Sequence, residues 1–441
     1  MIRSLISATV SAGFLLVATQ PAAAAVDIQE VSSPAGLTAW LVEDHTLPFV
    51  ALDISFRGGA SLDAPGKRGA INLMAGMLEE GCGDRDSRGF AEAREALAAS
   101  YSFDAGDDTV SIGARMLTEN RDQAVALLKC ALTRPSFAPD ALERVRGQVL
   151  SGIAAEAVDP QALAAKAFGA QAFGDHPYAT SVSGTADSVQ GLTADDLRDA
   201  KDRVLARDRI VISAAGDITP EALGKLIDEL TAELPATGAE MPGRAPMDLT
   251  GGVTIVPFDT PQSVVIFGEK GIKRDDPDFF PAYVLNQIIG GGGFSSRLMQ
   301  EVREKRGLTY GAYSYIVPRD FAETWQGSFA SSNDKVAEAV QVVRDVWTDI
   351  AQNGVTEAEL EAAKTYLLGS YPLRFDGSSN IASILDGMQL DHLTPDYVET
   401  RDAKVEAVSL EDIKRVAAEY IRPDALRFVV TGQPAGLAAS N

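Results

Sequence analysis

Two polar side chains in the segment FSSRLMQEVREKRGLTYGAYSY could bind a peptide carbonyl group. Arg303 and Tyr310 are seven residues apart, with Gly307 between them. A guanidinium and a phenol both donate hydrogen bonds, so they suit a carbonyl oxygen or the negative charge that develops on it. Composition alone also allows a simpler role, in which Arg303 pairs with a carboxylate such as Asp320 and Tyr310 packs in a strand. Arg306 is equally basic and lies nearer to Tyr310, but the seven-residue spacing favours Arg303.

The remaining residues with catalytic chemistry are scattered. The three histidines, His45, His176 and His392, each lack a second His or Cys at ligand spacing. We therefore expect ordinary surface or strand-end histidines and no metal site in this chain. No Gly-x-Ser-x-Gly motif occurs, and neither cysteine has a nearby histidine in sequence, so a lone hydrolase with another nucleophile has little support.

The two cysteines could form a disulfide in an oxidising compartment. Cys82 follows a glycine in a segment expected to be a loop, and Cys130 lies near the end of a helical pattern over residues 122–132. The sequence does not decide between the alternatives. We favour two unpaired, partly buried thiols, with a disulfide as the alternative.

The first 25 residues have the pattern of a secretory signal peptide. MIRSLISATVSAGFLLVATQPAAAA joins Arg3 to an apolar run over residues 5–18 and then to small residues. The run is shorter than the roughly 20 residues that a membrane span needs. We predict a mature chain that begins near Val26, has no membrane span, and is periplasmic or secreted.

The composition restricts the partners. The 441 residues contain 39 basic and 62 acidic residues, which gives a formal charge of −23. This charge repels phosphate backbones, so nucleic acid is excluded as a partner. It can serve solubility alone or attract basic peptides. The length exceeds what one core usually holds, so two or more domains are expected.

The sequence contains two copies of one unit. LTADDLRDAKDRVLARDRIVISAAGD and VSLEDIKRVAAEYIRPDALRFVVTGQ align without gaps, pairing Leu192 with Val408 and Gly216 with Gly432. Other equivalent stretches lie 212 and 218 residues apart, and such a long period indicates duplicated domains. Pro and Gly residues mark a linker between the copies. We predict a signal peptide at 1–25, an N-terminal domain at 26–233, a linker at 234–250 and a C-terminal domain at 251–441.

Alternating apolar residues predict strands, and longer periodic stretches predict helices between them. Each half is therefore expected to be α+β, with helices covering one face of a sheet. The strands are expected around 50–56, 110–116 and 264–266, and the helices at 70–78, 88–98, 122–132, 138–155 and 193–205.

Several long stretches, in order, resemble the insulinase/pitrilysin family of zinc metallopeptidases, the group that includes mitochondrial processing peptidase. They are DHTLPFVALDISFRGGASLDAPGKRGAINLMAGMLEEG, FGDHPYATSVSGTADSVQGLTADDL, GGGFSSRLMQEVREKRGLTYGAYSY and LLGSYPLRF. The resemblance extends over nearly the whole mature chain. It implies two tandem homologous α/β-sandwich domains, related by a pseudo-twofold duplication, in a clamshell arrangement.

The family's zinc motif, His-x-x-Glu-His on a helix, is degenerate in this chain. Two histidines four residues apart share a helix face and can both reach a metal, while the Glu acts as a base. The resemblance places Asn72 at the first His, Ala75 at the Glu and Gly76 at the second His. A third ligand, a Glu on a later helix, corresponds to Ser151 or Gly152.

Without these donors the chain cannot hold zinc or lower the pKa of a zinc-bound water from about 15.7 to about 7. Glu156 lies about one helical turn from the third ligand position and does not replace it. We expect no cofactor in this chain.

The resemblance assigns a role to Arg303 and Tyr310. In the family, an Arg and a Tyr at this spacing project from the second domain toward the zinc site and hold the carbonyl oxygens of the substrate. Just before them, the run Gly290, Gly291, Gly292, Gly293 implies either a glycine-rich loop that handles substrate or a plain flexible connection.

Two functions follow from the resemblance. In the first, this chain is the zinc-free subunit of an exported heterodimeric peptidase: a zinc-bearing homologous partner supplies the metal, and this chain supplies Arg303, Tyr310 and a wall of the chamber for peptide substrates. In the second, the clamshell is a non-proteolytic structural or peptide-binding module. The retained Arg303 and Tyr310 favour the first function.

Overall fold

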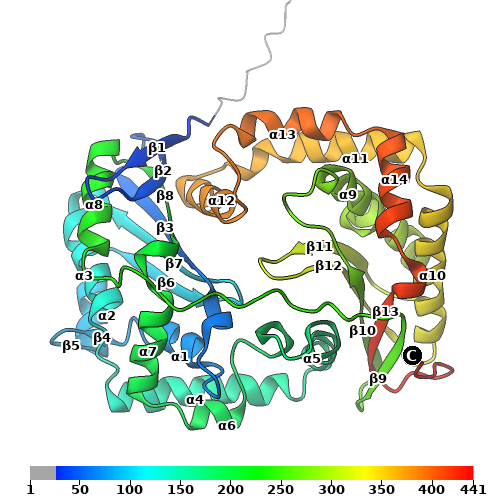
Figure 1. Ribbon diagram of the computed structural model, residues 1–441, viewed down its shortest axis with the longest axis horizontal. Coiled ribbons are helices and arrows are strands. Elements are labelled where there is room, and N and C mark those ends of the chain that lie inside the picture. Colours follow the sequence, from blue (N-terminus) through cyan, green and yellow to red (C-terminus); the bar gives the residue numbers. More distant parts are fainter. Residues whose placement is uncertain (1–25, 441) are drawn as a thin grey trace, which may run out of the picture.

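The computed structural model describes residues 26–440, and its chain folds into two halves, each built on one mixed β-sheet with helices packed against it (Figure 1). This confirms the α+β class. The predicted signal peptide at 1–25 lies outside the described residues.

The first half contains a six-stranded sheet in the order β1-β2-β8-β3-β7-β6. β2 and β8 are parallel, and the other neighbouring strands are antiparallel. A two-stranded ribbon, β4 (Gly81–Cys82) and β5 (Arg85–Asp86), lies apart from it. The bounds of the six strands are Gln29–Ser32 (β1), Thr38–Glu43 (β2), Phe49–Arg57 (β3), Ser100–Ala105 (β6), Thr109–Leu117 (β7) and Ile210–Gly216 (β8).

The second half contains a five-stranded sheet in the order β9-β13-β10-β12-β11. β9 and β13 are parallel, and the remaining pairs are antiparallel. Apart from β1, this order and these directions repeat those of the first sheet. The bounds of its strands are Gly252–Pro257 (β9), Gln262–Lys270 (β10), Ala312–Pro318 (β11), Glu323–Ser332 (β12) and Arg427–Gly432 (β13). Gly216 and Gly432, paired in the sequence, end the equivalent strands β8 and β13, so the duplication is confirmed.

The helices of the first half pack mainly on one face of its sheet. Leu73, Leu128 and Ile227, from three of these helices, share one core cluster with Leu52 and Ile112 of the sheet, as expected for amphipathic helices that bury one face. The bounds are Ala70–Gly76 (α1), Ser87–Ala96 (α2), Arg121–Thr133 (α3), Pro139–Glu156 (α4), Pro160–Phe173 (α5), Ala186–Gln190 (α6), Ala194–Val204 (α7) and Pro220–Thr231 (α8).

The helices of the second half repeat this pattern. Leu285, Trp347 and Val416 pack with Phe267 and Phe428 in a second core cluster. The bounds are Phe279–Asn286 (α9), Val336–Asn353 (α10), Glu357–Ser370 (α11), Ser378–Leu390 (α12), Tyr397–Glu406 (α13) and Leu410–Tyr420 (α14), with π-helical segments at Gln287–Gly291 (η5) and Met299–Glu304 (η7).

The two halves exchange one helix each. α5 belongs to the first half but packs on β10 and β13, where Phe168 and Ala172 meet Ile266 and Val429. α12 belongs to the second half but packs on β8 and β3 (Figure 1). The two helices begin 218 residues apart, at Pro160 and Ser378, which is one of the offsets of the duplication. Each half therefore completes the buried surface of the other.

Between α8 and β9, residues 235–251 contain no helix or strand. This segment crosses from one half to the other, and Ala245 is buried with Phe168 in the cluster that α5 forms on the second sheet. Across residues 26–440, no helix combines the length and the apolar character that crossing a membrane requires.

Cys82 and Cys130 form a disulfide bond, so the expectation of two unpaired thiols was wrong. Cys82 is not in a loop but in the short strand β4, and its neighbour Gly83 donates a 3.0 Å backbone hydrogen bond to Arg134, just after α3. This pairing brings Cys82 against the last turn of α3, where Cys130 lies. The Cα atoms are 5.6 Å apart, within the range that a disulfide spans.

Candidate functional site

Arg303 and Tyr310 flank a turn at the surface of the second half. Arg303 lies on the π-helical segment η7, which the chain leaves through Gly307, whose φ is +60°. The backbone N–H of Leu308 donates to the carbonyl of Val302 at 3.0 Å and closes the turn. Tyr310 follows, two residues before β11. Both side chains line one open pocket of about 480 Å³.

The polar groups of this pair face solvent. Tyr310 is 84% exposed, and neither its hydroxyl nor the Arg303 guanidinium makes a hydrogen bond to any other residue between 26 and 440. Only the Glu304 carboxylate approaches Arg303, 3.4 Å from its Nε. Asp320 lies instead 3.8 Å from Arg57. Arg303 therefore lies beside Glu304 and not Asp320, and Tyr310 is exposed and does not pack in a strand. Of the simpler role, the surface ion pair of Arg303 with a carboxylate is present, with Glu304 as its partner.

Arg306 is held in place by the protein itself. Its Nη1 donates to both the carboxylate and the backbone carbonyl of Glu301, each at 2.7 Å. Arg303 is thus the arginine in this turn whose donors remain available.

The glycine run is not an irregular loop. Gly290 and Gly291 end the π-helical segment η5, and Gly293 begins a short 3-10 turn (η6, Gly293–Ser295). Gly290 is buried against β11: a Cβ atom there would lie 2.3 Å from the backbone nitrogen of Ser314. Gly291 is exposed. The structure therefore gives Gly290 a packing role, while substrate binding by the run stays a prediction.

The positions of the degenerate zinc motif lie on two packed helices. Asn72, Ala75 and Gly76 are on α1, and Gly152 is on α4, which packs against α1. Ala75 is buried, with 2% of its surface exposed. Gly76 is the last residue of α1, and a Cβ there would lie 3.3 Å from Val145 of α4. The helices that carry the ligands in the family are present, but their donors are not.

These residues do not fit a zinc ion. An amide, a methyl group and two glycines provide at most one weak ligand, whereas zinc sites use three or four His, Cys or carboxylate donors. Nor are three His, Cys, Asp or Glu side chains grouped to hold a metal anywhere between residues 26 and 440. The Glu156 carboxylate accepts a 3.4 Å hydrogen bond from the Ser181 hydroxyl.

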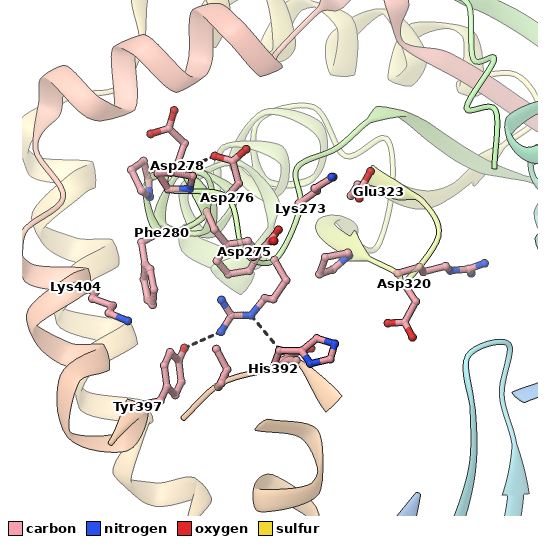
Figure 2. Close-up of a pocket in the computed structure, with 18 of the residues that line it drawn as sticks. Lys273, Asp275, Asp276, Asp278, Phe280, Asp320, Glu323, His392, Tyr397 and Lys404 are labelled. Carbon is pink, nitrogen blue, oxygen red and sulfur yellow. Dashed lines mark hydrogen bonds and ion pairs between the residues drawn. The ribbon is translucent and has the colours of Figure 1, made fainter. Parts of the chain in front are cut away.

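A larger pocket of about 1070 Å³ lies where the two halves meet, and it does not include Arg303 or Tyr310. Arg274 lines this pocket, 3.0 Å from Asp391 and 3.1 Å from the hydroxyl of Tyr397, which Figure 2 labels among the lining residues. The Arg274 guanidinium also lies over the ring of Phe279 at 4.3 Å. Acidic and basic side chains both line this pocket, so its charge selects no single class of ligand.

Two carboxyl groups connect the halves beside this pocket, the half-buried Asp108 and the buried Asp386. Asp108, after β6, accepts hydrogen bonds from the Tyr178 hydroxyl and, at 3.4 Å, from the backbone N–H of Asp320. Burial raises the pKa of Asp108 to about 6. Burial likewise raises the pKa of Asp386, on α12, to about 7. These carboxyl groups belong to the junction of the halves and lie outside the Arg303–Tyr310 pocket.

Sequence reasoning missed two features near these sites. Phe294 is 62% exposed, and the Cζ atom of Arg303 lies 4.6 Å from the centre of its ring. An aromatic residue directly after four glycines was the only signal for it. Asp386 was signalled only by its place as a carboxylate in the apolar stretch SILDGMQL.

A duplicated α+β clamshell, with a helix pair that lacks metal donors in one half and an exposed Arg/Tyr pair in the other, defines a metallopeptidase-like protein whose zinc-motif positions within residues 26–440 cannot hold a metal ion. The sequence profile of the insulinase family, peptidase family M16, matches residues 38–186, and the profile described as the peptidase M16 inactive domain matches residues 191–367. The chain belongs to the insulinase family, peptidase family M16.

Full-length relatives agree with this assignment. A Helicobacter pylori protein named non-peptidase homolog YmxG is 28% identical over 88% of this chain and 90% of its own length. An uncharacterized zinc protease of Streptomyces coelicolor is 27% identical over 89% of this chain and 87% of its own length. The crystal structure of a peptidase M16 inactive domain from Pseudomonas fluorescens has a TM-score of 0.86 and 29% identity, covering 94% of this chain and 99% of that one.

Proposed function

We propose that this chain is the zinc-free subunit of an exported heterodimeric peptidase of the M16 family. A zinc-bearing homologue supplies the metal, the attacking water and the base. This chain supplies Arg303, Tyr310 and part of the chamber wall. The observation that carries the proposal is the availability of the Arg303 guanidinium and the Tyr310 hydroxyl at one pocket, in a chain whose own zinc-motif positions lack donors.

The two side chains act on the carbonyl groups of a peptide substrate. Each N–H of the guanidinium and the O–H of the phenol can donate to a carbonyl oxygen, and the positive charge of Arg303 stabilises an oxyanion more than a neutral carbonyl. Within residues 26–440 the Nη groups of Arg303 and the Tyr310 hydroxyl have no hydrogen-bond partner, so these donors can bind the substrate without first breaking an internal hydrogen bond. Placing donors in advance is the arrangement that makes such groups effective.

Export is part of the proposal. The predicted signal peptide supports it, and so does the Cys82–Cys130 disulfide, because disulfides persist mainly in oxidising compartments.

Purification of the mature chain with and without the zinc-bearing homologue from the same genome tests the proposal. The isolated chain should contain no stoichiometric zinc and cleave no peptide. The complex should contain one zinc per heterodimer and cleave peptides. Stoichiometric zinc in the single chain, together with cleavage abolished by chelation, would refute the assignment.

A non-proteolytic peptide-binding module is the second candidate. It is favoured by the Helicobacter pylori relative, which is named a non-peptidase homolog, and by the large pocket between the halves. In this case no homologue would confer cleavage, while calorimetry would still detect peptide binding by the isolated chain. Cleavage by the complex would exclude this candidate.

A further inference from the structure

The ring of Phe294 is exposed to solvent and stacked on one charged group. Phe294 belongs to none of the apolar clusters that residues 26–440 form, and 62% of its surface is exposed. The Cζ atom of Arg303 lies 4.6 Å from its ring centre, within the distance at which a cation and an aromatic face attract each other. The ring therefore serves Arg303 and not the core.

The backbone holds Phe294 in position from both sides. Its carbonyl accepts a 2.7 Å hydrogen bond from Gln300 Nε2. The residue before it, Gly293, has φ of +55° and accepts hydrogen bonds from both the N–H and the hydroxyl of Ser296, at 3.1 and 2.8 Å. Ser296 is itself buried. The turn that carries the ring is thus fixed to the start of the helix that carries Arg303.

The preceding glycines permit this path. Besides Gly290 against Ser314, a Cβ on Gly292 would lie 2.7 Å from the Gln287 carbonyl oxygen. Larger residues at these two positions would push the chain away from β11 and from η5. The glycine run is needed to bring Phe294 beside Arg303, whether or not it touches substrate.

Stacking leaves the donors of Arg303 free. A planar guanidinium binds an aromatic ring through its face and carbonyl oxygens through the N–H groups at its edge. An ion pair would occupy those edge groups, as Glu301 does for Arg306. Only Glu304 approaches the edge of Arg303, at Nε, so the two Nη groups remain unpaired within the described part of the chain.

We propose that Phe294 is a positioning residue for Arg303, holding its guanidinium by the face so that the Nη donors point to the peptide carbonyl. The inference rests on the proposed function, because it assigns Arg303 to substrate binding. Without the ring, the Nη groups of Arg303 are free to turn toward Glu301 or Glu304, and they are then paired with the protein and no longer available to the substrate.

The test is a double-mutant cycle in the complex with the zinc-bearing homologue, comparing Phe294→Ala, Arg303→Ala and the double variant. Phe294→Ala should lower kcat/KM roughly 2- to 5-fold, the range expected for an exposed cation–π contact, with the change divided between kcat and KM as in Arg303→Ala. The double variant should be no worse than Arg303→Ala. Phe294→Tyr should keep the wild-type kcat/KM, and Phe294→Leu should show the same loss as Phe294→Ala.

A second measurement needs no partner. In the isolated chain, the Nε–Hε NMR resonance of Arg303, assigned by its loss in Arg303→Lys, should carry a ring-current shift that disappears in Phe294→Leu. Tyr366→Ala is the matched control, since Tyr366 is 58% exposed on α11 and no described cation lies over its ring. It should change neither kcat/KM nor the Arg303 resonance.

The outcomes separate the two proposals. If Arg303→Ala reduces cleavage but Phe294→Ala does not, or if the two losses multiply, the positioning role is wrong and the shared site stands. An unchanged Arg303 resonance in Phe294→Leu also overturns the positioning role. If Arg303→Ala and Tyr310→Phe both leave cleavage intact, the proposed function itself fails.

Discussion

The Asp386 carboxylate accepts a 2.7 Å hydrogen bond from the Ser55 hydroxyl, and this contact joins the two halves of the chain. Asp386 lies on α12 and Ser55 on β3. The other carboxylate oxygen, Oδ1, is buried and meets no donor within residues 26–440. The pKa of Asp386 is raised to about 7, chiefly by burial and to a smaller extent by the nearby Asp53 charge, while the Ser55 hydrogen bond and the Arg57 charge oppose the rise.

This raised pKa predicts that stability falls as pH rises. Asp386 binds its proton more tightly in the folded protein than at its ordinary pKa of 3.8. The stabilisation is therefore complete below about pH 4 and is lost as pH rises to 7, a change in the free energy of unfolding on the order of 4 kcal/mol. Asp386→Asn mimics the neutral form, so its free energy of unfolding should exceed that of the wild type increasingly from pH 5 to pH 8. Urea unfolding at several pH values measures this difference.

Asp376→Asn is the control for this pH effect, because Asp376 is exposed near the start of the same helix. It shows how much the removal of an exposed carboxylate from this end of the helix changes the free energy of unfolding at each pH. If the free energies of unfolding of Asp386→Asn and the wild type differ by the same amount from pH 5 to pH 8, Asp386 is already ionised in the folded protein over this range and the prediction is wrong.

Arg303→Ala and Tyr310→Phe should each reduce kcat of the heterodimer by about 10²- to 10³-fold, the usual effect of removing one donor to a developing oxyanion. Arg306→Ala is the matched control in the same turn, since its guanidinium is bound to Glu301. It should leave kcat unchanged. Size-exclusion chromatography should show intact heterodimer for all three variants, and wild-type turnover in both Arg303→Ala and Tyr310→Phe would remove the shared site.

Much of the fold was predictable because it depends on local patterns. The alternation from Val50 to Phe56 identifies β3, and the equivalent glycines Gly216 and Gly432 identify the duplication. The exchange of α5 and α12 was not predictable, because periodicity shows that a helix buries a face but not which sheet receives it. Phe168 and Leu385 look like ordinary core residues of their own halves.

Only the part of the candidate site that depends on residue spacing was predictable from the sequence. The seven-residue interval from Arg303 to Tyr310 survives in the structure as two side chains on one pocket. The Phe294–Arg303 stack depends on a π-helical segment and a positive φ at Gly293, and neither leaves a periodic signal. The Cys82–Cys130 bond was missed because the short strand that places Cys82 beside α3 has only two residues.

The disulfide should contribute strongly to stability. It closes a segment of 48 residues, and the chain-entropy estimate for such a loop is about 4 kcal/mol. Cys82→Ala/Cys130→Ala should therefore lower the free energy of unfolding by about 2–4 kcal/mol. Dithiothreitol should destabilise the wild type by a similar amount and leave the double variant unaffected. Two titratable thiols in the unreduced, denatured wild type would contradict the pairing.

Two glycine-to-alanine changes should shift the stability of the folded chain in opposite directions. In Gly290→Ala, the new methyl group would lie 2.3 Å from the backbone nitrogen of Ser314 and 2.5 Å from its hydroxyl. Ser314 cannot retreat easily, because it is paired in the sheet and bonded to Asn286, so we expect a loss of about 1–3 kcal/mol. Gly152 lies within α4 with open space around its Cβ position. Gly152→Ala should gain about 0.5–1 kcal/mol from helix propensity. Urea unfolding compares both variants with the wild type, and wild-type stability in Gly290→Ala would show that the run does not pack closely against β11.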